Sequence, residues 1–97
     1  MRMYKKQIQT VISEELTNLI NKQGYALHTD FVNMIHNKYG FCVTNITGIL
    51  ARTYPTLDLI KRHTNADIKR FYNIAVKGNA LIYLRKRSDY HETTKRL

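Results

Sequence analysis

Residues 44–54 contain side chains of the kinds that can recognise the edges of DNA bases. Asparagine can pair bidentately with adenine and arginine with guanine, and a threonine methyl group can contact the methyl group of thymine. The segment also contains a glycine, which lowers helix propensity but allows a close approach to the backbone. Short polar residues also occur on ordinary solvent-facing helices, so either interpretation fits the pattern alone. The candidate base-contacting residues are Thr44, Asn45, Thr47, Gly48, Arg52 and Thr53.

An amphipathic helix would position these side chains. Thr44 can cap the start of the helix, and Pro55 would end it because proline cannot continue a helix. The polar candidates occupy the positions that remain once the apolar stripe is buried. That stripe consists of Ile46, Ile49, Leu50 and Tyr54.

A second amphipathic helix precedes it, from the capping residue Thr29 to Tyr39, and Gly40 is placed where a helix ends. The bridging residues 40–43 contain Cys42, which we interpret as a small apolar residue of the turn. Two helices joined by a turn of about four residues that contains glycine are typical of a helix-turn-helix. In that motif the second helix enters the DNA major groove.

The composition fits one domain. The chain has 97 residues, of which 43% are hydrophobic, and its one cysteine rules out an internal disulfide. The spacing of cysteine and histidine does not match a zinc site, and we expect no metal or cofactor. No run of 18 apolar residues is present, so we expect no membrane association and a cytoplasmic location, in a host cell if a phage encodes the chain. We expect a domain over residues 1–87 and a flexible polar tail over residues 88–97.

Positive charge is concentrated in the second half of the chain. The formal net charge is +9, and residues 51–97 hold eleven of the basic side chains against four acidic ones. Such a field suits a polyanion, because contacts with phosphates release counterions and give affinity without a sequence match. Solubility alone, or an acidic protein partner, would also account for the charge.

The first helix is predicted over residues 5–23, with an apolar stripe at helical spacing and Gly24 at its end. We expect it to pack on the two helices of the central unit, although part of the stripe could form a dimer contact. The link Tyr25 to His28 is where a winged-helix domain has a short strand. For His28 we expect a structural hydrogen bond rather than catalysis.

The region after Pro55 is harder to assign. Residues 56–67 are undecided: Leu57, Leu59 and Ile60 could begin a short helix capped by Thr56 or belong to a strand, and residues 64–67 mark a turn. From Ile68 to Val76 apolar residues roughly alternate, Lys77-Gly78-Asn79 is a turn signal, and residues 80–84 are prone to form a strand, so we predict a β-hairpin. Residues 67–75 also fit helical spacing. The expected phosphate contacts in and around this hairpin are Lys61, Arg62, Lys69, Arg70, Lys77, Arg85, Lys86 and Arg87.

The predicted fold class is α+β, a three-helix winged helix-turn-helix with a C-terminal β-hairpin as the wing. This order of elements resembles the winged helix-turn-helix superfamily. Residues 8–54 are similar to the DNA-binding module of arginine repressors, in which a threonine-initiated helix leads through a glycine and an aromatic residue into Val-Thr. The resemblance implies that the third helix contacts DNA. The matching positions are Thr29, Gly40, Phe41, Val43 and Thr44, whereas Ile49 and Leu50 replace the serine and arginine of that family.

These features favour a small sequence-specific transcriptional regulator that binds double-stranded DNA, as a homodimer on two half-sites. The alternative is a phage or mobile-element protein that binds a host protein through the same fold. An enzyme is disfavoured, since no phosphate-binding glycine loop or paired-carboxylate motif is present. The four histidines, 28, 36, 63 and 91, are also dispersed along the chain.

Overall fold

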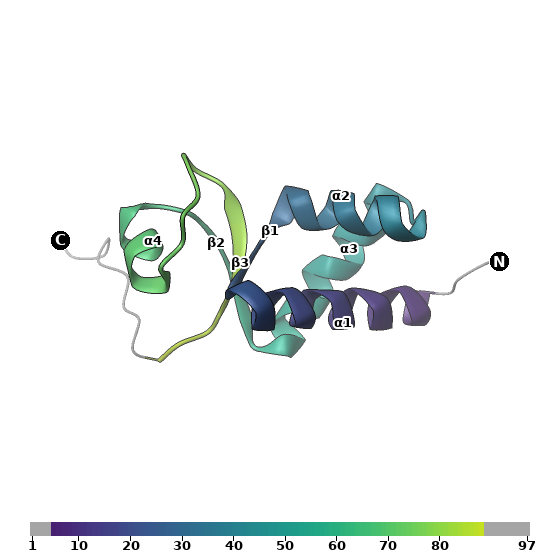
Figure 1. Ribbon diagram of the computed structural model, residues 1–97. Helices are drawn as coiled ribbons and strands as arrows, with labels where there is room; N and C mark the ends of the chain where they lie inside the picture. Colours follow the sequence, from purple (N-terminus) through teal and green to yellow (C-terminus); the bar gives the residue numbers. More distant parts are fainter. Residues whose placement is uncertain (1–4, 89–97) are drawn as a thin grey trace.

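The computed structural model describes residues 5–88, with the backbone alone described for residues 5 and 6. The predicted tail, beyond Ser88, lies outside these residues. Three helices form one end of an elongated molecule, a small sheet crosses its middle, and a fourth helix lies at the other end (Figure 1). The molecule extends over 52 × 25 × 24 Å. The fold is α+β, with four α-helices rather than the three expected from the sequence.

The three helices of the first part form where their apolar spacing predicts them. They are α1 (Lys5–Gln23), α2 (His28–Tyr39) and α3 (Val43–Thr53), and a 3-10 turn, η1 (Tyr54–Leu57), contains Pro55. Gly40 ends α2 with φ of 76°, a left-handed conformation that glycine adopts without steric cost, and its N–H donates to the carbonyl of His36. The expected threonine caps, Thr29 and Thr44, were both wrong by two positions. Leu27 and Cys42 occupy the N-cap positions of α2 and α3.

The sheet has three antiparallel strands in the order β1-β3-β2. The short link after α1 is strand β1 (Tyr25–Leu27), and the undecided segment after Pro55 is strand β2 (Leu59–His63). Strand β3 (Leu81–Arg85) lies between them, with Ala26 and Lys61 on either side of Tyr83. The central strand is therefore the last one in sequence.

The predicted hairpin was wrong in its first strand. Residues 68–76 do not pair with β3, which pairs instead with β2, and most of the predicted strand forms helix α4 (Ala66–Tyr72) in the connection. The side chain of Asn65 accepts a hydrogen bond from the N–H of Ile68 at 2.8 Å, and Asn73 ends the helix in the left-handed conformation. The caps at both ends of this segment favour a helix over the strand that the alternating residues suggested, in agreement with the helical alternative.

The core is divided by the sheet. Ala26, Leu59 and Tyr83 belong to the larger cluster, together with the buried faces of α1, α2 and α3. Ile82 and Leu84 face the opposite side and pack on Ile68 of α4 and Ile74. Since successive side chains of a strand point to opposite faces, burial of Ile82, Tyr83 and Leu84 in succession requires cover on both faces of β3.

Candidate nucleic-acid interface

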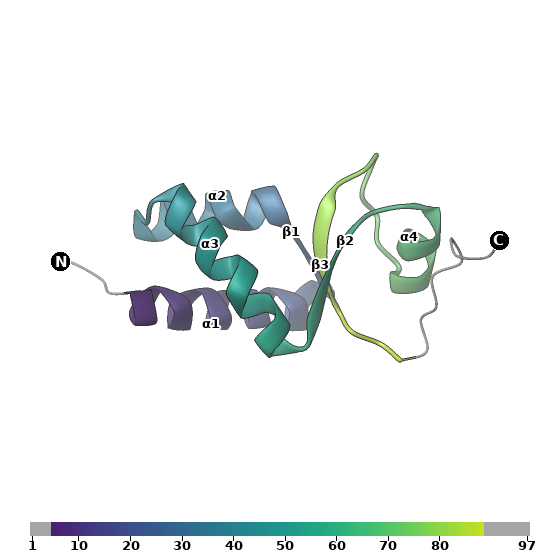
Figure 2. The same ribbon diagram turned by 180° about the vertical axis from the view of Figure 1, so that it is seen from behind.

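Five of the six predicted base-contacting residues are exposed or half-buried on the outer face of α3. Ile46, Ile49 and Leu50 are buried on the opposite side of the helix. Figure 2 shows α3 in front of α1 and α2, so this face is turned outwards from the helical cluster. Thr44, Asn45 and Arg52 are exposed, as is Ala51, whereas Thr47 and Gly48 are half-buried.

Thr53 is a correction to the predicted set. Its side chain is 0% exposed, and its hydroxyl donates to the carbonyl of Ile49 at 2.7 Å, within the helix. A hydroxyl buried in this way cannot reach a base. Ala51 was not among the predicted residues, although helical spacing from Thr44 and Gly48 places it on the same face.

Gly48 lies near the middle of this face. A Cβ atom built at Gly48 would have no heavy atom of a neighbouring residue within 4 Å, and its φ is not in the left-handed region that favours glycine. Neither packing nor backbone conformation in the described chain therefore requires a glycine here. Relative to alanine, the glycine costs the helix about 1 kcal/mol.

Arg52 and Asn45 have side chains that no other described residue engages. Among the described arginines, Arg52 is alone in this respect. Arg70 pairs with Asp67 at 2.8 Å, Arg85 donates to Asn21 of α1, and Arg87 stacks over Phe71 with 4.4 Å between its Cζ atom and the ring centroid. The Arg52 guanidinium and the Asn45 amide are thus available to an external partner.

The predicted phosphate-contacting residues fall into separate groups. Lys61 and Arg62 are on β2, which follows α3 through η1, and Lys61 lies over the ring of Tyr54 at 5.5 Å from its centroid. Arg62 donates to the carbonyl of Lys61 at 2.9 Å. Lys69 and Arg70 lie on α4, and Arg87 stacks over Phe71 of the same helix, whereas Arg85 is held against α1. Lys77 and Lys86 are exposed outside the helices and strands.

His28 and Tyr83 form a polar contact where α2 meets the sheet. A hydrogen bond of 2.7 Å joins the hydroxyl of Tyr83 to Nδ1 of His28. Burial, with a smaller contribution from Tyr54, raises the pKa of Tyr83 to about 12. Partial burial, followed by the nearby charge of Lys61, lowers the pKa of His28. His28 has the structural hydrogen bond that we expected, with a partner 55 residues away.

The lowered pKa of His28 predicts a loss of stability in acid. As the pH falls, the unfolded chain takes up this proton first, because its histidine keeps the ordinary pKa of about 6.5. The contribution of His28 to the free energy of unfolding is therefore fully present at pH values above the ordinary pKa. It declines as the pH falls towards the lower pKa of the folded state. His28→Gln should reduce the slope of the unfolding free energy against pH, measured by urea unfolding between pH 5 and 8. Exposed His63→Gln is the control, and equal slopes for wild type and His28→Gln would contradict the prediction.

Cys42 lies in the turn, as expected, at the N-cap position of α3, and it is exposed. The backbone N–H of Asn45, and then that of Thr44, lower the pKa of its thiol. His36, on the preceding helix, is exposed, and its Nδ1 donates to the carbonyl of Phe41 at 2.7 Å. This bond and the Gly40 cap fix the angle between α2 and α3.

The end of α2 is also tied to α1. Lys38 donates to the carboxylate of Glu15 at 2.8 Å, and the hydroxyl of Tyr39 donates to the same oxygen. The hydrogen bond from Lys38, followed by that from Tyr39, lowers the pKa of Glu15. The ring of Tyr39 stacks on Phe41 with 5.4 Å between centroids. These contacts hold the end of α2 and the turn that follows it against α1.

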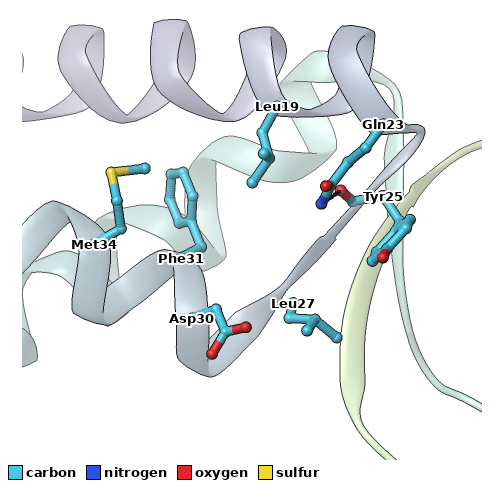
Figure 3. Close-up of a pocket in the computed structure, with 7 residues that line it drawn as sticks. All are labelled: Leu19, Gln23, Tyr25, Leu27, Asp30, Phe31 and Met34. Carbon is cyan, nitrogen blue, oxygen red and sulfur yellow. Dashed lines mark hydrogen bonds between the residues drawn. The ribbon is translucent and has the colours of Figure 1, made fainter. Parts of the chain in front are cut away.

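A groove of about 320 Å³ lies between α1, β1 and α2. Figure 3 shows Leu19, Phe31 and Met34 directed into the space between the two helices, with Asp30 at the rim and α3 behind the groove. The groove and the exposed face of α3 therefore lie on opposite faces of the helical cluster. The remaining lining residues are Gln23, Tyr25 and Leu27.

Within residues 5–88, no group of three or more His, Cys, Asp or Glu side chains is arranged to hold a metal ion. In the same part of the chain, no helix is both long and apolar enough to span a membrane. Comparison with known proteins finds no matching family model, no similar curated protein and no similar solved structure.

Proposed function

We propose that this protein is a winged-helix DNA-binding protein and a sequence-specific transcriptional regulator, with α3 in the major groove. The arrangement of α1, β1, α2, α3, β2 and β3 supports a winged-helix assignment, with the antiparallel pair β2 and β3 as the wing and α4 inserted between these strands. An α-helix fits the width of the major groove. The exposed face of α3 has side chains suited to such a contact.

The strongest support comes from Gly48. A glycine on an exposed helical face lowers stability, and the described chain gives no packing or backbone reason for it. A partner that approaches the helix backbone closely does give a reason. Asn45 and Arg52 lie on the same face and have no partner among the described residues, and they provide the polar groups that such a partner could engage.

The positive charge of the chain supports a polyanion as the partner. The chain has a formal net charge of +9, and Lys61 and Arg62 lie on the strand that follows α3 through η1. In the proposed complex these two residues contact the phosphate backbone, while Asn45 and Arg52 contact bases. Lys69 and Arg70, on α4 beyond the sheet, are further candidates for phosphate contacts in the proposed complex. Thr53 and Arg85 are not included, because the first is buried and the second is directed towards α1.

The test begins with selection from a random duplex library, followed by affinity measurements at two salt concentrations. Wild type should enrich a motif, and each phosphate contact should add about −0.9 to the slope of log affinity against log salt concentration. A palindromic motif would indicate a homodimer on two half-sites. If no duplex is retained even at low salt, the proposal is wrong and capture of a protein partner after nuclease treatment is the next experiment.

Two substitutions separate base contacts from phosphate contacts. Arg52→Ala should weaken binding to the selected duplex by about 5- to 150-fold. Lys61→Ala should weaken binding to all duplexes and reduce the salt slope by about 1. Lys22→Ala, at an exposed position at the end of α1, removes one positive charge outside the proposed interface and is the control. Equal losses in all three variants would indicate a general charge effect and contradict the assigned roles.

A further inference from the structure

We infer that α3 recognises a half-site in which an adenine and a guanine lie about three base steps apart, separated by pairs that present thymine methyl groups. Asn45 would bind the adenine and Arg52 the guanine. This inference rests on the proposed DNA-binding function and specifies the target of the same helix.

The spacing follows from helix geometry. Asn45 and Arg52 are seven residues apart, which is close to two helical turns, so both side chains lie on the same face of α3. With a rise of 1.5 Å per residue, their Cα atoms are about 10.5 Å apart along the helix axis. One base step along a strand is about 3.4 Å, so a helix that follows the groove places the two side chains about three steps apart.

Availability distinguishes these two side chains from the other candidates. The guanidinium of Arg52 has no partner among the described residues, whereas each of the other described arginines is already engaged. The Asn45 amide is likewise unengaged and lies in an exposed position. Asparagine can bind N6 and N7 of adenine together, and arginine can bind O6 and N7 of guanine together.

The residues between them lack groups for such paired hydrogen bonds. Gly48 and Ala51 have no polar side-chain atoms, and the hydroxyl of Thr47 already donates to the carbonyl of Thr44 at 3.0 Å. Alanine and the threonine methyl group can contact the methyl group of thymine. The middle of the face is therefore suited to thymine, and the absence of a side chain at Gly48 leaves room for the bases to approach.

The test is a selected motif measured base by base. For wild type, replacing the adenine or the guanine of the motif should each weaken binding by about 5- to 150-fold. Asn45→Ala should remove the preference at the adenine position and leave the guanine preference, and Arg52→Ala should do the reverse. Replacing thymine by uracil in the intervening pairs, which removes only the methyl group, should also weaken binding to wild type.

The outcomes distinguish this inference from the proposed function. If a motif is enriched but both substitutions weaken binding equally at every base, DNA binding stands and the assigned base contacts are wrong. Adenine and guanine preferences on adjacent steps, or six or more steps apart, would overturn the geometry. A failure to enrich any motif would instead contradict the sequence-specific function itself. Circular dichroism and thermal unfolding of each variant confirm that it folds.

Discussion

Gly48→Leu should stabilise the folded protein and abolish sequence-specific DNA binding. Leucine has a high helix propensity, and the new Cβ would meet no heavy atom within 4 Å, so the free energy of unfolding should rise by about 0.5–1 kcal/mol. In the proposed complex the leucine side chain would occupy the space of the bases. We expect a loss of affinity for the selected duplex of at least about 100-fold, equivalent to about 2.7 kcal/mol.

The two effects of Gly48→Leu have opposite signs, so loss of binding cannot be attributed to unfolding. Gly48→Ala is the graded variant, with a similar gain in stability and a smaller loss of affinity. Urea unfolding and fluorescence anisotropy on the same samples measure both quantities. Binding of Gly48→Leu with the affinity of wild type would show that this face of α3 does not contact DNA.

Leu50→Ala should bring the protein close to unfolding. Leu50 is 0% exposed in the larger cluster, and truncation of a buried leucine costs about 2–5 kcal/mol through lost burial and the cavity left behind. The total stability of a small domain is about 5–15 kcal/mol, so this substitution removes a large part of it.

Val43→Ala is the control for Leu50→Ala on the same helix. Val43 is 42% exposed, so its truncation should change the midpoint of urea unfolding only slightly. Equal shifts for Leu50→Ala and Val43→Ala would contradict the packing of α3 described above. The midpoint is a suitable measure because we expect both variants to keep the m-value of wild type, which is the slope of the unfolding free energy against urea concentration.

The sequence predicted the first three helices well because each has apolar residues at helical spacing and a clear end. Gly40 is the clearest case, since a left-handed residue is needed there and the sequence supplies glycine. The caps were less predictable. Leu27 and Cys42 occupy the cap positions without a side-chain hydrogen bond, so tertiary packing, rather than a capping side chain, fixes where α2 and α3 begin.

The pairing of β2 with β3 was predicted less well because the two strands are distant in sequence. Strand β2 ends at His63 and β3 begins at Leu81, so no short turn marks their pairing. The signal Lys77-Gly78-Asn79 suggested a local hairpin, but Asn65 caps a helix in this connection instead. Both faces of β3 are covered, so its apolar residues are consecutive. They do not alternate with polar residues, as they would in a strand with one exposed face.

The candidate interface was predictable in outline and not in detail. Asn45 and Arg52 follow from residue chemistry and helical spacing, and the structure places both at the surface. Thr53 looked equally suitable in the sequence, because a threonine can either face solvent or bond to its own helix. Only the packing of α3 shows that its hydroxyl bonds to the carbonyl of Ile49. The partners of Arg70, Arg85 and Arg87 likewise depend on tertiary contacts.

The position of β3 at the centre of the sheet has a consequence for synthesis of the chain. Strands β1 and β2 are made first, but they pair only with β3, whose residues 81–85 are translated last of the three. Until then both strands lack their partner, and Ala26 and Leu59 lack the cover of Tyr83. A nascent chain that stalls before Leu81 should therefore expose two unpaired strands and need a chaperone to avoid aggregation.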